Sequence, residues 1–147
     1  MVGNDMEARS VDEYWIIVGN RDSWARELSM LTARAAVLED QVSALKNAID
    51  GMHMQEEVLG DVLAGIARIP SACGLWQGAR AQEFFSQCTE GSLYGTYRGA
   101  LDAAASAIRK LEAALRDLQG RLEEVHASSL EADENYAYWA QKAAYYW

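Results

Sequence analysis

Two histidines stand beside carboxylates at helical spacings, and they carry most of the sequence's potential for site chemistry. His53 precedes Glu56 and Glu57, and His126 follows another glutamate pair. Each set offers two or three ligands on one helix face, whereas zinc prefers four ligands that close around it. We interpret both sets as solvated helix faces and expect no metal site.

The other polar residues give no sign of catalysis. Acidic pairs such as Glu39 and Asp40 recur along the chain and fit solvated helix faces. No glycine-rich loop follows a strand, as a phosphate-binding loop requires, and the sequence offers few polar groups that would converge in a pocket. The sequence therefore predicts a protein that is not an enzyme and uses no cofactor, with no catalytic residues.

The formal net charge of −9 restricts the classes of partner. Nucleic-acid binding needs clustered Lys and Arg that release counterions, and no such cluster is present. An acidic chain is not attracted to anionic lipid, and no stretch is apolar for long enough to span a bilayer. We expect neither nucleic acid nor membrane as a partner. The first residues do not resemble a signal peptide, so export would use a route independent of one.

Two cysteines, Cys73 and Cys88, lie near the middle of the chain. Their spacing is compatible with a disulfide across a bend, and equally with two small buried side chains. Both alternatives stay open at this point. Two thiols without a third Cys or a His nearby do not make a zinc site.

The first half of the chain has a helical pattern. A single proline and few β-branched runs favour helix over sheet. From Trp24 to Ile66, apolar residues recur at spacings that alternate between four and three. We call this row of apolar residues the first seam. It predicts a helix over 22–69, preceded by a separate segment over 1–21. Its one polar position is Glu56, whose carboxylate we expect to be solvated.

The second half repeats this pattern from Tyr97 to Tyr146. It predicts a helix over 79–146 with a break near 86–96, where Gly, Ser and Thr cluster. The two seams together supply a partner-binding stripe that includes Leu38, Leu45, Leu111, Leu115, Leu118 and Leu122.

Together the two seams predict an all-α, single-domain antiparallel hairpin with its turn at 70–78. If the second helix is continuous, paired residues have numbers that sum to about 149 or 150, as for Leu38 with Leu111. A loop of about seven residues would shift every pair by one heptad and still match seam to seam. We also expect Trp139 and its neighbours to pack on residues 14–18.

The predicted turn contains a Trp-x-Gly triplet, Trp76-Gln77-Gly78, followed by Phe84. It resembles the turn of the WXG (ESX-type) family, small bacterial proteins exported by type VII secretion. The resemblance implies a hairpin that pairs antiparallel with an identical or related hairpin into a four-helix bundle. Apolar residues beside the first seam, such as Val37 and Val58, independently favour a second hairpin.

The family's export signal has a second half, Tyr-x-x-x-Asp/Glu, whose nearest counterpart here is Ser129 to Asp133. Ser129 replaces the tyrosine. The resemblance therefore implies a partner whose dimer mate carries the intact signal, or a relative that is not exported. The alternative is an intracellular coiled-coil adaptor or chaperone for the helical targeting region of a larger effector. The expected location is outside the cell, reached through the secretion machinery, or the cytoplasm for a chaperone.

Overall fold

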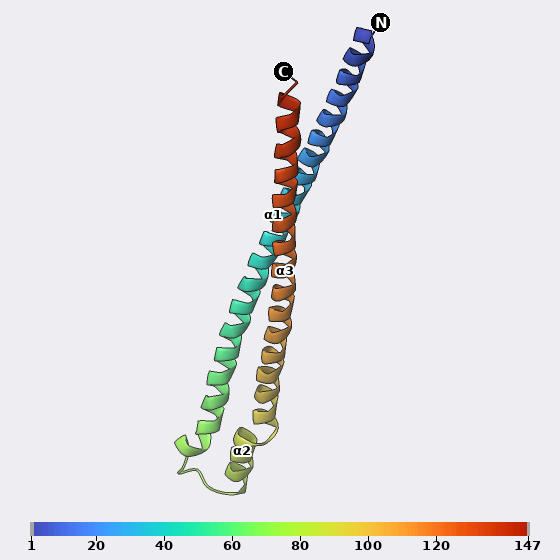
Figure 1. The fold of residues 1–147 in the computed structure, drawn as a ribbon. Coiled ribbons are helices and arrows are strands. Elements are labelled where there is room, and N and C mark those ends of the chain that lie inside the picture. The colour runs from blue at the N-terminus through green and yellow to red at the C-terminus, as the bar shows by residue number, and fades with distance from the viewer. Residues whose placement is uncertain (1, 147) are drawn as a thin grey trace. The chain divides into compact units, whose positions relative to one another are not determined.

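The computed structural model describes residues 2–146, with side chains from residue 10 onward. It consists of three α-helices: α1 (Val2–Ala72), α2 (Ala79–Thr89) and α3 (Ser92–Ala144) (Figure 1). No strand occurs among the described residues. The all-α class and the helical hairpin are thus confirmed.

Helix α1 begins far earlier than the sequence predicted. Residues 2–21 are helical and continue into the predicted helix without a break at Gly19-Asn20, so the separate N-terminal segment is wrong. A glycine inside a helix costs only about 1 kcal/mol relative to alanine, which apolar packing can offset. Stepping back from Trp24 by three, four and three residues reaches Arg21, Ile17 and Tyr14. All three are buried or half-buried.

The turn and the break fall close to their predicted places. α1 ends at Ala72, one helical turn or less beyond the predicted end, and includes Pro70 in its last turn. Residues 73–78 form the turn, and the break between α2 and α3 consists of Glu90 and Gly91 alone. The predicted interruption near 86–96 is therefore confirmed, and it is short.

The seam positions form the core. Every seam residue from Trp24 to Ile66 in α1, and from Tyr97 to Ala143 in α3, is buried or half-buried. Glu56 is among them and is more enclosed than predicted, with 36% of its side chain exposed. The four-three spacing thus identified the buried stripe of both long helices.

The chain divides into two compact units, which are described separately. The first unit comprises Met1–Val42 with Asp117–Trp147, and the second comprises Ser43–Arg116. In the first unit, Leu31, Leu38, Val125 and Ala132 form a core cluster. Trp24, Leu28, Ala35, Leu118 and Leu122 pack around it.

The helices pair in a register that differs from the predicted one. In the first unit Glu39 lies beside His126, and in the second His53 lies beside Glu112, so both pairs have numbers that sum to 165. The predicted sum of about 149 was too low by about two heptads, and the predicted pairing of Leu38 with Leu111 was therefore wrong. The reason is α2, a separate short helix that takes up residues assumed to lie in the paired seam.

Candidate interaction surfaces

The turn that carries the Trp-x-Gly triplet is built by backbone hydrogen bonds and one unusual glycine. The amide of Trp76 donates to the carbonyl of Cys73 at 2.9 Å and closes the turn after α1. Gly78 has φ +115° and immediately precedes α2, where its carbonyl accepts from the Gln82 amide at 3.0 Å. Side chains with a Cβ rarely adopt this conformation. Gly78 is therefore a requirement of the turn geometry.

Trp76 packs in an aromatic cluster with Phe84 and Phe85, which we call the tip cluster. Its ring centroid lies 5.8 Å from Phe84 and 5.7 Å from Phe85, the second pair at right angles. Such edge-to-face pairs contribute beyond the area that they bury. The contacts with the two phenylalanines hold the Trp76 ring in place, while 49% of the residue remains exposed to solvent. The sequence pointed to Trp76 and Phe84 but missed Phe85, which only the placement of α2 brings to the tryptophan.

The two cysteines differ in exposure and are both free thiols. Cys73 is exposed in the turn, and Cys88 in α2 is fully buried. The disulfide considered from the sequence does not form in the structure. Cys88 instead follows Ala81 by seven residues, and these are the two buried residues of α2. It acts as a small apolar side chain of the core.

The break between α2 and α3 is fixed by close contact between Gln87 and Gly91. A Cβ on Gly91 would stand 2.7 Å from the Gln87 Cα, so only glycine fits without displacing backbone. The Gln87 Oε1 accepts hydrogen bonds from the Ser92 amide at 2.8 Å and the Ser92 hydroxyl at 2.6 Å. It thereby satisfies a free amide at the start of α3. A cluster of Gly, Ser and Thr indicated this break but not its contacts.

One side of each unit is polar, and we call it the polar side. Nε2 of His126 lies 3.6 Å from Oε1 of Glu39 in the first unit, and Nε2 of His53 lies 4.0 Å from Oε1 of Glu112 in the second. Between 44% and 58% of each side chain is exposed, and a histidine attracts a carboxylate by charge only when it is protonated, so these contacts add little stability. Among the described residues, no group of three or more potential ligands could hold a metal ion.

The opposite flank of the second unit is apolar. In a heptad pair, the positions on the two sides of the core form separate flanks, and the His53–Glu112 contact marks one of them as polar. Most residues on the other flank are small or apolar. We define this apolar side by Gly51, Val58, Val62, Ala103, Ala107 and Ala114.

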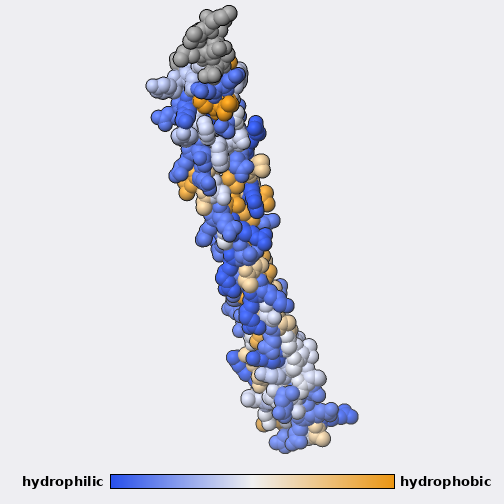
Figure 2. Space-filling view, turned by 45° about the vertical axis from the view of Figure 1, so that its right-hand side comes forward, coloured by the Kyte–Doolittle hydropathy of each residue, from blue (hydrophilic) through white to orange (hydrophobic). Residues whose placement is uncertain are grey.

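The apolar side is open to solvent. Val58 is 60% exposed and Val62 is 38% exposed. Val58 also lines a shallow hollow of about 550 Å³, together with Gly51, Met54, Gln55 and Leu59. On the face drawn in Figure 2, apolar side chains, in orange, lie among hydrophilic ones and are most frequent in the half of the molecule nearest the grey residues. Exposed apolar residues that recur along a helix make this side a candidate interaction surface.

The leucines assigned to a partner-binding stripe mainly hold the hairpin itself. Leu38 is buried in the first core cluster, against which Leu118 and Leu122 pack. The other three leucines of the stripe are half-buried in the second unit: Leu45, Leu111 and Leu115. The intramolecular seam therefore uses these residues, and the apolar side is a separate surface.

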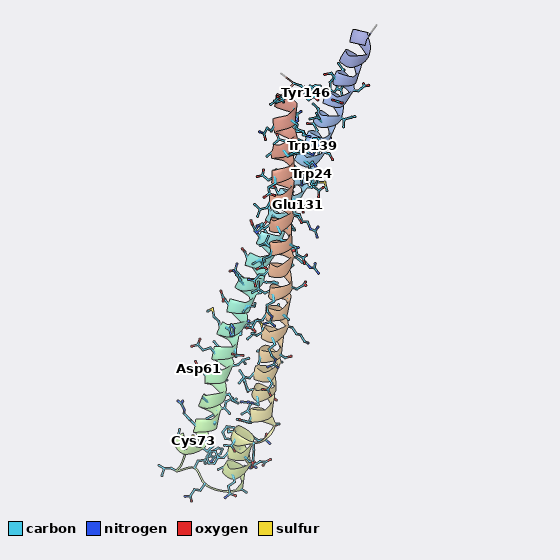
Figure 3. The ribbon with its side chains drawn as sticks, in the orientation of Figure 1. Trp24, Asp61, Cys73, Glu131, Trp139 and Tyr146 are labelled. Carbon is cyan, nitrogen blue, oxygen red and sulfur yellow. The ribbon has the colours of Figure 1, made fainter. Side chains whose placement is uncertain are left out.

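The residues of the degenerate second motif lie on α3. Ser129 is half-buried and Asp133 is exposed, four residues apart on one helix. Glu131 between them is labelled in Figure 3, and its carbonyl accepts a hydrogen bond from the Asn135 side chain at 2.9 Å. Ser129 and Asp133 belong to the first unit, whereas the tip cluster belongs to the second.

Tyr146, near the C-terminus, packs on the N-terminal part of α1, whereas the packing of Trp139 on residues 14–18 stays a prediction. The Tyr146 ring centroid lies 6.0 Å from that of Tyr14, and its hydroxyl donates to Glu13 at 3.3 Å. Tyr146 and Ile17 line a hollow of about 460 Å³ (Figure 3 labels Tyr146). Lys142 stacks over Tyr138, with Nζ 4.8 Å from the ring centroid. Partial desolvation, followed by the hydrogen bond to and the charge of Glu13, raises the pKa of Tyr146 above its usual 10.0.

No helix in the described part of the chain is long and apolar enough to cross a membrane. The sequence was also compared with known proteins. No protein-family model matches it, and neither the curated proteins nor the solved structures searched include a match.

Proposed function

We propose that this chain is a non-enzymatic protein of a type VII (ESX-like) secretion pathway, either an exported substrate or the dimer partner of one. In this role it assembles with a second helical hairpin into a bundle. The observation that carries the proposal is the Trp76-Gln77-Gly78 turn between two long helices. The resemblance to the WXG family rests on this triplet.

The geometry of the tip suits a docking function. Phe84 and Phe85 support the Trp76 ring from α2, while about half of its surface stays open. A rigid aromatic anchor that buries further area on binding is a common energetic centre of protein interfaces. Trp76 would thus dock on the secretion machinery without first paying to order its side chain.

Bundle formation is supported by the apolar side of the second unit. Val58 and Val62 are exposed in the single chain. Burial of either side chain against a partner would stabilise the complex. A two-helix unit buries one stripe per helix, and a second hairpin is the simplest cover for the next stripe. The partner would be a related hairpin, identical or different.

The second candidate function is an intracellular coiled-coil adaptor or chaperone for the helical targeting region of a larger effector. Ser129 favours it, because serine lacks the aromatic ring of the Tyr-x-x-x-Asp/Glu motif. The same apolar side would then hold the effector's helices. In the first function the chain is secreted without a signal peptide, and in the second it stays in the cytoplasm.

An export assay tests the first function. The chain is produced in a bacterium that has a type VII system, and its amount in the culture supernatant is compared with that of Trp76→Ala. Leu75→Ala is the matched control, because Leu75 is 99% exposed beside the tryptophan. We expect Trp76→Ala to abolish export of the chain or of its partner, and Leu75→Ala to leave it unchanged. Equal export of all three proteins would exclude this mechanism.

The same strain distinguishes the second function. Native purification of a tagged chain shows which proteins accompany it. A larger effector that co-purifies from the cytoplasm, with no chain in the medium, would support the chaperone function. A hairpin of similar size in the complex would support the secretion function.

A further inference from the structure

Helix α1 runs past the end of α3 in the first unit. Glu39 lies beside His126, so residues of this unit whose numbers sum to about 165 stand at the same height. Ala144, the last residue of α3, therefore stands close to the level of Arg21. We call residues 10–18 the α1 extension, because they lie beyond the level at which α3 ends.

The α1 extension carries an apolar stripe that is only partly covered. The stripe consists of residues at the spacings of one helix face: Val11, Tyr14, Trp15 and Val18. Val11 is 54% exposed and Trp15 is 63% exposed. Tyr146 covers part of the stripe, since its ring centroid lies 6.0 Å from that of Tyr14. A stripe with this spacing suits packing against another helix, and α3 has already ended.

Two hollows accompany the stripe. The smaller one, of about 190 Å³, is lined by Ser10, Val11, Tyr14 and Tyr146. The larger one is the hollow of about 460 Å³ that Ile17 and Tyr146 line. Tyr146 therefore takes part in both, and the hollows adjoin each other. We call this surface the extension groove and define it by Val11, Tyr14, Trp15, Ile17 and Tyr146.

The charge beside the extension groove is negative. By helical spacing, Asp12 and Glu13 border the stripe on its two sides, and both residues are exposed. Among the residues whose side chains are described, neither carboxylate forms an ion pair. The nearby Arg21 is already paired with Asp22, at 2.9 Å. A partner at this groove therefore meets two carboxylates that a cation can neutralise.

Aromatic rings near the groove already hold a cation. Nζ of Lys142 lies 4.8 Å from the ring centroid of Tyr138 and 5.4 Å from that of Trp139. Tyr145, which lines the larger hollow, is 93% exposed, and Trp15 is exposed on the stripe. Lysine and especially arginine side chains stack on such ring faces. The exposed rings thus favour the same charge of partner as the carboxylates do.

We propose that the extension groove binds a basic amphipathic helix of another protein. The seam that pairs α1 with α3 continues through Ile17 and Tyr14, and the partner helix lies beside the α1 extension, beyond the end of α3. Its apolar residues pack on Val11 and Trp15. Its lysines and arginines meet the carboxylates and stack on the exposed rings. The groove belongs to the first unit, so this proposal does not depend on the tip cluster or on the apolar side.

Charge disfavours the other occupants of such a surface. A second copy that met the groove through its own α1 extension would bring the carboxylates of Asp12 and Glu13 against the same residues, and each chain carries a net charge of −9. Anionic lipid would be repelled for the same reason. A basic helix is attracted both by the two carboxylates and by the charge of the whole chain.

Titration of the full chain with a synthetic peptide tests this proposal. The probe has about 21 residues, with leucines at alternating spacings of three and four and with Lys, Arg and Gln elsewhere. One comparison peptide has Glu in place of every basic residue, and a second has the same composition as the probe in scrambled order. Calorimetry gives the dissociation constants for the unmodified chain, Trp15→Ala and Asp12→Lys. Met30→Ala is the matched control, because Met30 is 66% exposed elsewhere on α1.

We expect the probe to bind the unmodified chain and Met30→Ala equally. Trp15→Ala should weaken binding about tenfold, as the loss of an aromatic anchor does, and Asp12→Lys should weaken it most at low salt. Circular dichroism should show the same helix content in all four proteins, because the substituted side chains are exposed. The acidic and scrambled peptides should not bind.

The opposite results identify which part of the proposal is wrong. Failure of the probe to bind, or equal affinity for Trp15→Ala and the unmodified chain, would overturn the proposed surface. Equal binding of the scrambled peptide would overturn a helical partner, and binding of the acidic peptide would overturn a basic one. Co-sedimentation with phosphatidylcholine vesicles that is lost in Trp15→Ala would replace the partner helix by a membrane.

Discussion

Oε1 of Glu39 on α1 lies 3.6 Å from Nε2 of His126 on α3, and this contact shows the register of the first unit. The neighbouring Leu38 and Val125 belong to the same core cluster. Since the pair Glu39 and His126 is exposed, it adds little stability by itself. The apolar residues beneath it supply most of the stability, and they give the first prediction.

Leu38→Ala should lower the free energy of unfolding by about 2–4 kcal/mol, because it removes a buried side chain and leaves a cavity. Leu38 is only 7% exposed. The control is Met30→Ala on the same helix, since Met30 is 66% exposed and should change stability little. Urea denaturation followed by circular dichroism measures both. Equal effects would contradict the assigned core.

Gly78→Ala should destabilise the turn by about 1–3 kcal/mol, the usual cost of a side chain in a backbone region that only glycine enters readily. Gly78 has φ +115° and ψ 175°. Gly74→Ala is the control, because its Cβ would meet the Ser71 carbonyl at an ordinary 3.6 Å. Hydrogen exchange of the α2 amides reports the loss locally. Unchanged protection in Gly78→Ala would show that the turn has another conformation.

Gly91→Ala should loosen the connection between α2 and α3, because its Cβ would lie 2.7 Å from the Gln87 Cα. By contrast, Gly95→Ala lies inside α3 with nothing within 4 Å and should stabilise the chain by up to about 1 kcal/mol. Thermal unfolding of the two variants should therefore shift in opposite directions. A rise in melting temperature for both would contradict the close contact at Gly91.

Glu13→Gln should lower the pKa of Tyr146 towards 10.0, while the contribution of desolvation remains. The pKa of this tyrosine is raised in the folded chain, so the contact with Glu13 contributes its full stability below the ordinary pKa. That contribution is lost as the pH rises through the raised value. Tyrosinate absorbance of the Glu13→Gln variant, with Tyr146→Phe to identify the signal, measures the change. An unaltered titration would mean that Glu13 does not act on Tyr146.

The helices and their buried stripes could be predicted from the sequence because the four-three spacing leaves few alternatives over so many turns. The same spacing predicted the buried and half-buried stripe from Trp24 to Ile66 in α1 and from Tyr97 to Ala143 in α3. The segment before Trp24 was assigned incorrectly, although Ile17 and Tyr14 continue the seam at the proper intervals. That signal was present and was obscured by Gly19-Asn20.

The register could not be predicted, because any shift by whole heptads again matches seam to seam. What decides it is the separate helix α2, and α2 depends on a contact that no local pattern reveals, between Gln87 and Gly91. Only part of the tip cluster could be predicted, because its remaining member depends on the position of α2. Trp76 and Phe84 follow from the motif, whereas Phe85 reaches the tryptophan only once α2 has its place.

Because the two thiols differ in exposure, their rates of reaction with a thiol reagent can report motion near the turn. Cys73 is exposed and should react with a thiol reagent at once, whereas Cys88, with no exposed surface, can react only while α2 is detached from its neighbours. Its labelling rate therefore measures how often this end opens. A partner that docks on Trp76 and stabilises α2 should slow the labelling of Cys88, so binding at the tip can be followed without adding a probe.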